Sequence, residues 1–353
     1  MIADDSVVVR GLVARWLEES GFEVVATVPN GRLAIEALDR VEPDLVLLDL
    51  DMPELDGISA LPKLLEKRPN LSIIVVSTLT QRNADISLKC LRLGAVDYLP
   101  KPESNRHVTI SASFRAELIA KLKGLAAARQ RAALRASGAI RPDADREARS
   151  RLAPRSRHLP PRFVLIGAST GGPQAITQVL GGLGASLGHV PVLVVQHMPA
   201  FFTKAFAEHL SAQTGLAARE PEQGEKLAPG RIYVAPGGRH MGLERKGGQP
   251  VIRLDDGPPL NFCRPAVDVL FGDAAHVLGS SVLALVLTGM GSDGTEGART
   301  LIEAGATVLA QDEATSIVWG MPGSVARAGL AQTILPLPEI APTIRTYLSG
   351  SSK

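Results

Sequence analysis

Short apolar runs alternate with segments of helical period along the first third of the chain. The apolar runs predict strands at residues 22–28, 44–49, 71–76 and 97–99, after a very short first strand at residues 1–3. The helical periods predict helices at residues 7–19, 32–40, 58–67, 86–93 and 114–127. Strands that alternate with helices form parallel sheets covered on both faces. The pattern therefore predicts an α/β unit with a doubly wound, five-stranded parallel sheet.

The same alternation returns after residue 162. It predicts strands at residues 163–167, 191–196, 232–235, 282–287 and 307–311. It predicts helices at residues 173–180, 203–213, 266–277 and 294–304. We therefore expect a second α/β unit with a doubly wound, mostly parallel sheet. Ligands of such sheets bind at the carboxyl ends of the strands, so functional residues are expected there.

Between the two units, from about residue 128 to residue 161, the apolar periodicity fades and arginine becomes frequent. A polar, charge-rich stretch with several prolines is typical of a linker, and its start could be a frayed extension of the preceding helix. A nucleic-acid-binding tail is the alternative, but acidic residues interrupt the basic run. We predict a first domain at residues 1–122, an arginine-rich linker at 123–160 and a second domain at 161–350.

The composition narrows the class of protein. Hydrophobic residues make up 45% of the 353 positions, charged residues 21% and aromatic residues 4%, which fits a soluble two-domain protein and disfavours a nucleic-acid stacking surface. No apolar run approaches the roughly 20 residues of a membrane helix, and no leader is apparent. Cys90 and Cys263 lie in different predicted domains, so no disulfide is expected. We predict a cytoplasmic protein with no nucleic-acid partner and no direct membrane insertion.

Three aspartates follow strands whose carboxyl ends meet at one edge of the first sheet. Asp4 and Asp5 follow the first strand, and Asp49 ends the third. A cation would stabilise such a carboxylate cluster, and hard oxygen ligands suit Mg²⁺. Asp49 could then attack a phosphoryl group, with Lys101 as a positive charge for the phosphate and Ser77 as a hydroxyl that follows it. The alternative is that each aspartate only caps a helix.

Together these residues resemble the response-regulator receiver domain over the whole first predicted domain. The resemblance includes the Lys101-Pro102 pair and the pattern Asp49-x-x-Met52-Pro53. It implies a flavodoxin-like fold. It also implies phosphorylation of Asp49 by a histidine kinase partner.

The same resemblance implies a Mg²⁺ site formed by Asp4, Asp5 and Asp49 with the backbone of Asp51. One feature departs from the family's pattern: only residues 1–3 precede the acidic pair, where receivers have several apolar residues. We expect a first strand clipped by a misassigned start, and a sheet whose central pairing and stability are reduced.

A second candidate site centres on Ser169. The buried-type strand at residues 163–167 breaks into small residues around this hydroxyl before a predicted helix, which presents a nucleophile at a strand-to-helix turn. An activated serine needs a base within hydrogen-bond reach and a group that orients the base. His197 emerges at the carboxyl end of the next strand, whereas His209 and His276 lie in predicted helices. We therefore predict His197 as the base.

The predicted orienting acid is Asp293. Residues 285–294 repeat the design of a strand followed by a glycine-rich turn, and they bring Asp293 to the same edge of the sheet. Backbone N–H groups of the turns around Thr170 and Met290 are candidates to bind a developing oxyanion. The alternative for Asp293 is an N-cap of the following helix.

Two other motifs with a small-residue turn fit the sequence poorly. Gly167-x-Ser169-x-Gly171 matches the elbow of α/β-hydrolases. Those enzymes place the acid before the histidine, whereas the order here is Ser169, His197, Asp293. The glycines also match neither the dinucleotide-binding fingerprint nor the lysine-bearing phosphate loop.

Three separated motifs of the second domain resemble the catalytic domain of the chemotaxis protein-glutamate methylesterases, the CheB family. They are GASTGGP at residues 167–173, QHMP at 196–199 and TGMGSDG at 288–294. The similarity spans about residues 162–340 and includes His240, Met241 and Arg264. These three residues are predicted to support the cleft or contact substrate, with buried structural roles as the alternative.

The resemblance implies hydrolysis of glutamate γ-methyl esters on methyl-accepting chemoreceptors, and deamidation of receptor glutamine. It implies that Ser169 attacks the γ-carbonyl, that His197 takes its proton and later protonates the departing methanol, and that Asp293 holds His197 in the needed tautomer. No metal or organic cofactor is implied for the esterase.

The fusion of two such domains predicts a phosphorylation-controlled esterase. The unphosphorylated receiver would cover the Ser169 cleft, and phosphorylation of Asp49 would loosen that cover. A non-enzymatic regulator that binds partner proteins is the alternative, although the intact set of Ser169, His197 and Asp293 argues against it. A DNA-binding regulator is less favoured, because the second domain lacks a basic recognition helix.

Overall fold

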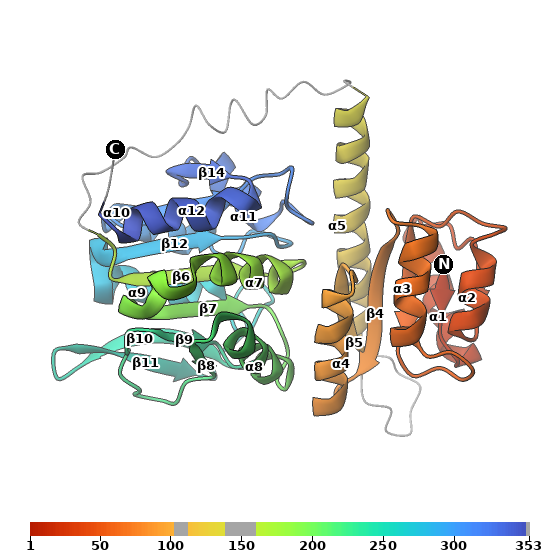
Figure 1. Ribbon diagram of the computed structural model, residues 1–353, viewed down its shortest axis with the longest axis horizontal. Helices are drawn as coiled ribbons and strands as arrows, with labels where there is room; N and C mark the ends of the chain where they lie inside the picture. Colours follow the sequence, from red (N-terminus) through yellow and green to blue (C-terminus); the bar gives the residue numbers. More distant parts are fainter. Residues whose placement is uncertain (102–111, 138–159, 351–353) are drawn as a thin grey trace. The chain divides into compact units, whose positions relative to one another are not determined.

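The computed structural model describes residues 1–101, 112–137 and 160–350 of the chain. The chain divides into two compact units, Met1–Lys123 and Gly124–Lys353, and each contains its own parallel sheet (Figure 1). Most of the predicted linker, residues 138–159, lies outside the described residues. Among the described helices, none combines the length and the apolar character that a membrane span requires.

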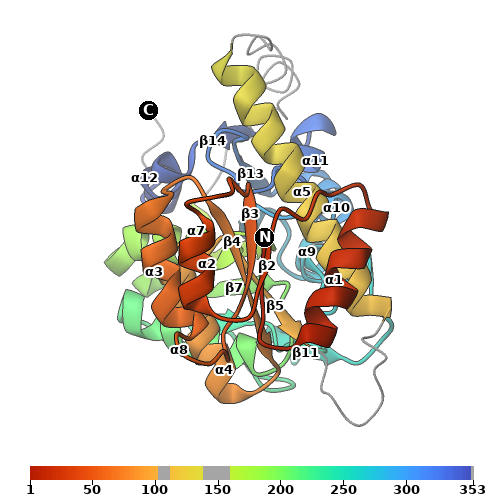
Figure 2. The ribbon, with the colours of Figure 1, turned by 90° about the vertical axis from the view of Figure 1, so that its right-hand side faces the viewer.

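The first unit is built on a five-stranded parallel sheet with the order β2-β1-β3-β4-β5 (Figure 2). Its strands are β1 (Ile2–Ala3), β2 (Thr27–Val28), β3 (Leu45–Asp49), β4 (Ser72–Thr78) and β5 (Asp97–Lys101). This arrangement confirms the predicted fold. The prediction of a strand over residues 22–28 is too long, because β1 offers β2 only Ile2 and Ala3 as ladder partners.

Helices cover both faces of this sheet, with α2 and α3 on one side and α1 on the other (Figure 2). They are α1 (Val7–Glu19), α2 (Gly31–Ala37), α3 (Gly57–Lys67), α4 (Gln81–Arg92) and α5 (Ala112–Ala136). Helix α4 begins earlier than the predicted residue 86, because the Thr80 side chain accepts a hydrogen bond from the Asn83 N–H and caps a polar first turn. Helix α5 extends to Ala136, into the segment that the sequence pattern assigns to the linker.

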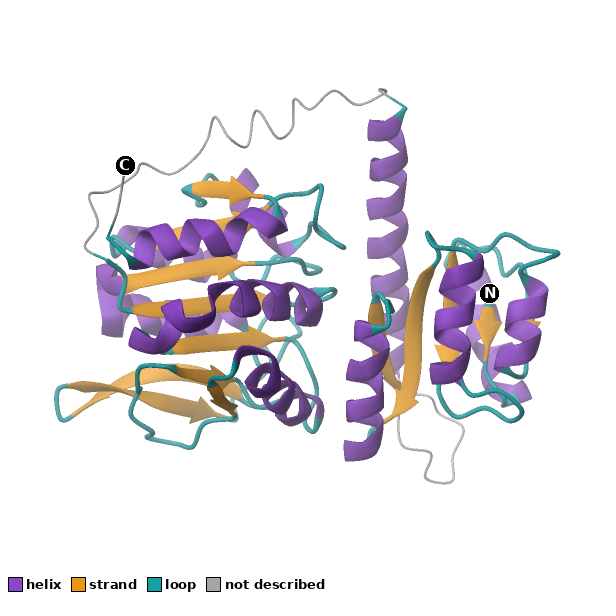
Figure 3. Ribbon diagram, viewed as in Figure 1, coloured by secondary structure: helices purple, strands orange, loops and turns teal. Residues whose placement is uncertain are grey.

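The second unit contains a seven-stranded, all-parallel sheet with the order β14-β13-β12-β6-β7-β9-β8 (Figure 3). Its strands are β6 (Phe163–Ala168), β7 (Val192–Gln196), β8 (Ala217–Arg219), β9 (Arg231–Val234), β12 (Val282–Val286), β13 (Thr307–Gln311) and β14 (Thr333–Leu335). The prediction of a doubly wound sheet is confirmed. The apolar pattern misses the edge strands β8 and β14, which have three residues each.

Helices pack in two layers against this sheet. One layer contains α7 (Gly172–Leu183), α8 (Phe202–Thr214) and α12 (Leu337–Leu348), and the other contains α9 (Val267–Leu278), α10 (Thr295–Glu303) and α11 (Met321–Arg327). An antiparallel hairpin of β10 (His240–Lys246) and β11 (Gln249–Asp255) packs against α9. Gly247 and Gly248 both have positive φ, as a two-residue hairpin turn requires, and this Gly-Gly pair is the signal that could have predicted the hairpin.

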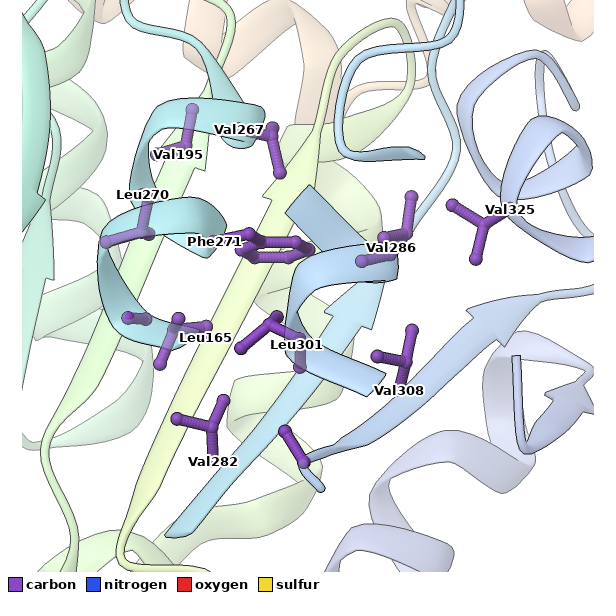
Figure 4. Close-up of a cluster of buried hydrophobic side chains, with 14 of the residues drawn as sticks. Leu165, Val195, Val267, Leu270, Phe271, Val282, Val286, Leu301, Val308 and Val325 are labelled. Atoms are coloured by element: carbon purple, nitrogen blue, oxygen red, sulfur yellow. The ribbon is translucent and has the colours of Figure 1, made fainter. Parts of the chain in front are cut away.

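The layer between the second sheet and helices α9 and α10 forms an apolar core (Figure 4). Alternate residues of the central strands face this layer, and each is at most 1% exposed: Leu165, Val282, Val286 and Val308. They pack with Phe271 and Leu301, which are fully buried. Burial of a side chain such as Phe271 contributes roughly 1.5–3 kcal/mol to the stability of the fold. The core therefore fixes the strands whose carboxyl ends carry the candidate site.

Candidate functional site

Strand pairing brings Ser169 and His197 side by side at the carboxyl edge of the second sheet. The register of β6 and β7 pairs Ala168 with Gln196, so the next residues of the two strands are Ser169 and His197. The His197 N–H donates to the Ala168 carbonyl over 3.1 Å and extends the ladder to this point. The predicted nucleophile and base are therefore neighbours because their strands are neighbours.

The backbone of Ser169 is held from two directions. Its N–H donates to the Thr288 carbonyl over 3.0 Å, and its carbonyl accepts from Gln196 Nε2 over 2.9 Å. Gly289 lies so close that a Cβ at this position would be 2.9 Å from Ser169 Cβ. The loop after β12 thus needs a glycine at 289 to approach the nucleophile, and it fixes the turn that presents the hydroxyl.

The imidazole of His197 is bound to Asp293, as the sequence predicts. His197 Nε2 and Asp293 Oδ2 are 2.8 Å apart, and Asp293 is buried. Burial alone would lower the pKa of His197, but the hydrogen bonds and charges of Asp293 and Cys263 overcome it and raise the pKa to about 9. The arrangement stabilises an imidazolium, which is the form that His197 takes after accepting a proton.

Asp293 is held in turn by backbone donors at the start of α9. Its two oxygens accept hydrogen bonds from the N–H groups of Val267, Asp268 and Gly294 over 2.6, 3.0 and 3.0 Å. Burial would raise the pKa of Asp293, but His197 and the N–H groups of Val267 and Asp268 hold it below its ordinary value. Asp293 is thus a fixed, ionised acceptor rather than only a helix cap.

Cys263 is a neighbour of His197 that the sequence reasoning missed. Its Sγ lies 3.4 Å from His197 Nδ1, while no hydrogen bond joins Ser169 Oγ to His197 in the part of the chain that the structure describes. Because Nε2 is committed to Asp293, Nδ1 is the ring nitrogen left to accept the Ser169 proton. Catalytic hydrogen bonds often form only once substrate is bound. Here a hydrogen bond from Ser169 Oγ to His197 Nδ1 can form only if Nδ1 gives up its contact with Cys263 Sγ.

A tight turn carries Cys263 to this position. The Cys263 N–H donates to the Leu260 carbonyl over 2.8 Å, the Leu260 N–H donates back over 3.1 Å, and the two residues between them have φ of 52° and 62°. The side chain of Asn261 donates to Asp268 Oδ2 over 3.0 Å and to Asp293 Oδ1 over 3.4 Å. One turn therefore contacts both the base and the orienting acid.

Thr170 and Met290 carry the predicted donors to an oxyanion. Thr170 is buried, and its carbonyl accepts a hydrogen bond from Thr288 Oγ1 over 2.9 Å. Across residues 160–350, no hydrogen bond occupies the N–H of Thr170 or of Met290. Both N–H groups therefore remain available as donors.

The acidic site of the first unit is built around one ammonium group. Lys101 Nζ lies 2.8 Å from Asp4 Oδ2 and 2.8 Å from Asp49 Oδ2. Burial raises the pKa of Asp49 to about 6, although Lys101 opposes the shift. The cavity here measures about 410 Å³ and is lined by Asp4, Asp5, Asp49, Thr78 and Lys101, among others.

The three carboxylates of this cavity fit a divalent cation. Oxygen atoms of Asp4, Asp5 and Asp49 all lie within 4.8 Å of one another. Asp4 and Asp49 are buried, carboxylates at this spacing repel each other, and Lys101 supplies only one positive charge. Carboxylate oxygens are the donors that Mg²⁺ takes in proteins, so the donor set agrees with the predicted ion.

Ser77 lies apart from these groups in the described structure. It is fully buried, and its hydroxyl is 3.0 Å from Ser87 Oγ. Its neighbour Thr78 lines the cavity instead, and Thr78 Oγ1 accepts a hydrogen bond from Asn83 Nδ2 over 2.6 Å. The structure therefore brings Asp4, Asp49 and Lys101 together, whereas the Ser77 hydroxyl forms a hydrogen bond with the Ser87 hydroxyl.

Comparison with known proteins identifies both units. The CheB methylesterase family matches residues 164–344, and the response regulator receiver domain matches residues 1–112. This chain belongs to the CheB methylesterase family. Its first unit is a receiver domain.

Relatives over the whole chain share this organisation. Two proteins named protein-glutamate methylesterase/protein-glutamine glutaminase, from Rhodopseudomonas palustris and Nitrobacter hamburgensis, are 49% and 50% identical to this chain. Each comparison covers 99% of this chain and 94% of the relative. The crystal structure of the Thermotoga maritima CheB methylesterase catalytic domain is 40% identical, covers 53% of this chain and 98% of that domain, and has a TM-score of 0.51. The predicted enzyme class and fold are confirmed.

In this methylesterase, two of the remaining predicted residues, His240 and Arg264, hold the loop around Cys263. His240 Nδ1 accepts from the Ala266 N–H over 3.2 Å, so its Nε2–H donates to the Pro258 carbonyl over 3.0 Å. Arg264 Nη1 donates to the carbonyls of residues 256 and 257 over 3.0 and 2.9 Å. Met241 is fully buried in the core. These contacts support the structural alternative for His240 and Met241.

Proposed function

We propose that this CheB-family methylesterase hydrolyses glutamate γ-methyl esters on methyl-accepting chemoreceptors, with Ser169 as nucleophile, and that it also deamidates receptor glutamine. The observation that carries the proposal is the pairing of β6 with β7, which sets Ser169 beside a histidine held by a buried aspartate. The relatives named as methylesterases and glutaminases support the choice of substrate.

The proposed reaction begins with attack of Ser169 Oγ on the γ-carbonyl carbon. The serine proton moves to His197 Nδ1, and Asp293 stabilises the imidazolium that results. The N–H groups of Thr170 and Met290 bind the oxyanion of the tetrahedral intermediate. Collapse of this intermediate breaks the bond to the methoxy group, which takes the proton from His197 and leaves as methanol.

A water molecule then completes the cycle. His197 removes a proton from the water, which attacks the acyl-enzyme ester, and as the bond to Ser169 Oγ breaks this oxygen takes the proton from His197 and the glutamate carboxylate is released. For glutamine the same steps apply, with ammonia as the first leaving group. All of these steps use side chains, backbone N–H groups and water.

In the receiver we propose that a histidine kinase phosphorylates Asp49. Asp4, Asp5 and Asp49, with the backbone of Asp51, would hold Mg²⁺, which when bound neutralises charge on the transferred phosphoryl group. Lys101 would then leave the Asp49 carboxylate and pair with the phosphate, and the Ser77 hydroxyl would turn toward the phosphate. The kinase and the receptor regions that carry the esters imply action in the cytoplasm.

Phosphorylation of Asp49 is proposed to raise esterase activity. The support is the fusion of a receiver domain to a methylesterase domain in one chain. Release of methanol from methylated receptor, measured with and without a phosphoryl donor, tests the switch. We expect faster release with the donor, and no such gain in Asp49→Ala.

Ser169→Ala tests the chemistry in the same assay. We expect methanol release to fall to the uncatalysed level while binding to the receptor is retained. If receptor adaptation survives in cells that carry Ser169→Ala, the protein acts by binding and the proposed hydrolysis is not its function.

A further inference from the structure

Exposed apolar side chains gather at the catalytic edge of the methylesterase unit. Among residues 160–350, four large apolar side chains are more than a third exposed: Phe201 at 52%, Leu260 at 43%, Phe262 at 103% and Ile317 at 38%. We call these four residues the apolar rim. Isolated exposed apolar residues are common on protein surfaces, but a group confined to one functional edge indicates a binding surface.

Each loop of the apolar rim also reaches the reactive groups. Phe201 follows His197 in the loop that leads from β7 into α8. Phe262 precedes Cys263, whose Sγ is 3.4 Å from His197 Nδ1. Ile317 packs on the Ser169 turn, because a Cβ at Gly171 would lie 2.6 Å from Ile317 Cγ1. The rim therefore approaches Ser169 and His197 from three separate loops.

Two members of the rim have a backbone conformation that is unfavourable for bulky residues. Phe201 has φ of 71° and Phe262 has φ of 62°, in the left-handed region that favours glycine. A glycine at either position would remove both the backbone strain and the exposed ring. Strained backbone conformations of this kind cluster at functional sites. The two rings are thus displayed toward solvent at a cost in stability.

We infer that the apolar rim binds the substrate polypeptide itself, through apolar side chains that flank the esterified glutamate. This inference rests on the proposed function and specifies its substrate. The γ-carbonyl of glutamate lies only roughly 4 Å from its Cα, since three C–C bonds of about 1.5 Å separate them. A polypeptide that brings this carbonyl to Ser169 must therefore lie across the loops that carry Phe201, Phe262 and Ile317.

The chemistry of the rim defines the partner. Aromatic rings that become buried on association commonly supply most of the binding energy of an interface. The rim offers two phenylalanines and two aliphatic side chains, and none of these carries a charge. The preferred substrate is a segment with apolar residues on both sides of the glutamate ester, and a segment with polar neighbours should be a poor substrate.

The test uses the full chain, treated with a phosphoryl donor, and three single variants: Phe201→Ala, Phe262→Ala and Ile317→Ala. Val8→Ala is the matched control, because Val8 is 55% exposed on α1 of the receiver. On methylated receptor we expect KM to rise about tenfold for the phenylalanine variants, with kcat little changed. On a small ester without flanking residues, the rim variants should change KM less than they do on receptor, and Val8→Ala should match the wild type on both substrates.

A pair of peptides supplies an independent readout. Both carry one glutamate γ-methyl ester, with leucines on either side in one and serines at the same positions in the other. The wild type should prefer the leucine peptide about tenfold in kcat/KM, and Phe262→Ala should lose most of that preference.

Three outcomes would overturn the inference. The first is an unchanged KM for receptor in all three rim variants. The second is a gain of activity in the unphosphorylated variants with no change in KM, which would assign the rim to the receiver. The third is a change of oligomeric state in the variants without a change in KM, which would assign it to a second copy of the chain. Failure of the proposed function is separate, because the wild type itself would then release no methanol.

Discussion

The two sites of this protein lie at the carboxyl ends of parallel strands, yet their electrostatics are opposite. In the receiver, the buried Asp49 shares one ammonium with Asp4, and burial raises its pKa to about 6. In the methylesterase unit, burial would also raise the pKa of Asp293, but His197 and the backbone N–H groups of Val267 and Asp268 lower it. A bound cation or phosphorylation would stabilise the Asp49 site, whereas hydrogen bonds already stabilise the charge of Asp293.

The comparison shows that strand topology sets where a site lies, while the loops set its chemistry. Both sheets deliver acidic residues to one edge, as open α/β sheets do. At Asp293 the start of α9 supplies backbone donors, so the carboxylate can orient a histidine. At Asp49 the neighbours are other carboxylates, so the site retains capacity for a ligand.

The largest loss of activity is expected from a substitution of Asp293. Asp293→Asn should lower kcat about 10⁴-fold, because the amide no longer stabilises the imidazolium or fixes the tautomer of His197. Single-turnover methanol release from methylated receptor measures the loss. Phosphorylation of Asp49 should be unaffected in this variant, and a parallel loss of phosphorylation would show that the fold had changed.

Removal of Mg²⁺ should separate the two sites. Chelation is expected to slow phosphorylation of Asp49 by a small phosphoryl donor by at least about a hundredfold, since a bound ion supplies several kcal/mol of charge stabilisation. Methanol release by the unphosphorylated protein should not change. A fall in this basal activity on chelation would contradict the assignment of the ion to the receiver alone.

The pH dependence of the esterase should report His197. Only neutral imidazole can accept the Ser169 proton, and the pKa of His197 is raised to about 9. The activity kcat/KM should therefore rise about tenfold per pH unit from neutral pH and level off above about pH 9. A profile that is flat between these limits would show that another group, or another protonation state, controls the reaction.

Substitution of Cys263 should show how far its contact with His197 Nδ1 controls the pH dependence of the esterase. Cys263→Ala removes an interaction that raises the pKa of His197, so the inflection of the pH profile should move to lower pH. The change in kcat/KM at neutral pH should stay within about tenfold. Cys263→Ser keeps a hydrogen-bonding group and should restore most of the original profile, whereas two identical profiles for Ala and wild type would exclude the contact.

The smallest effect concerns the receiver hydroxyls. Ser77→Ala leaves the buried Ser87 hydroxyl without its partner and should lower the free energy of unfolding by about 1 kcal/mol. If Ser77 also follows the phosphate, this variant is phosphorylated normally but shows less activation of the esterase than wild type. Thr78→Ala is the comparison, and full loss of activation in Thr78→Ala alone would move the role to Thr78.

The sequence predicted the residues that lie at or shortly after the carboxyl ends of regular strands. Ser169, His197 and Asp293 each come after a run of buried residues, and parallel strands place such residues at one edge. Neighbouring strands then bring Ser169 and His197 together without further information. Asp4, Asp49 and Lys101 were predictable for the same reason, and the structure joins them through Lys101.

Contacts made by irregular loops could not be read from the pattern. Cys263 and Asn261 reach the site because two consecutive non-glycine residues adopt positive φ, a conformation that local sequence does not predict for phenylalanine. The apolar rim could not be predicted for the same reason, because the exposure of its side chains depends on how loops that are distant in sequence pack together. The partner of the Ser77 hydroxyl depends on the packing of α4 against β4, which the pattern also leaves open.

Identification of the acyl-enzyme tests the central claim most directly, because both Ser169 and Cys263 lie beside His197. Wild-type protein treated with a phosphoryl donor is mixed with an esterified peptide, quenched in acid within one turnover, digested and analysed by mass spectrometry. We predict a glutamyl adduct on the peptide that contains Ser169, and none in Ser169→Ala. An adduct on the peptide that contains Cys263 would contradict the account.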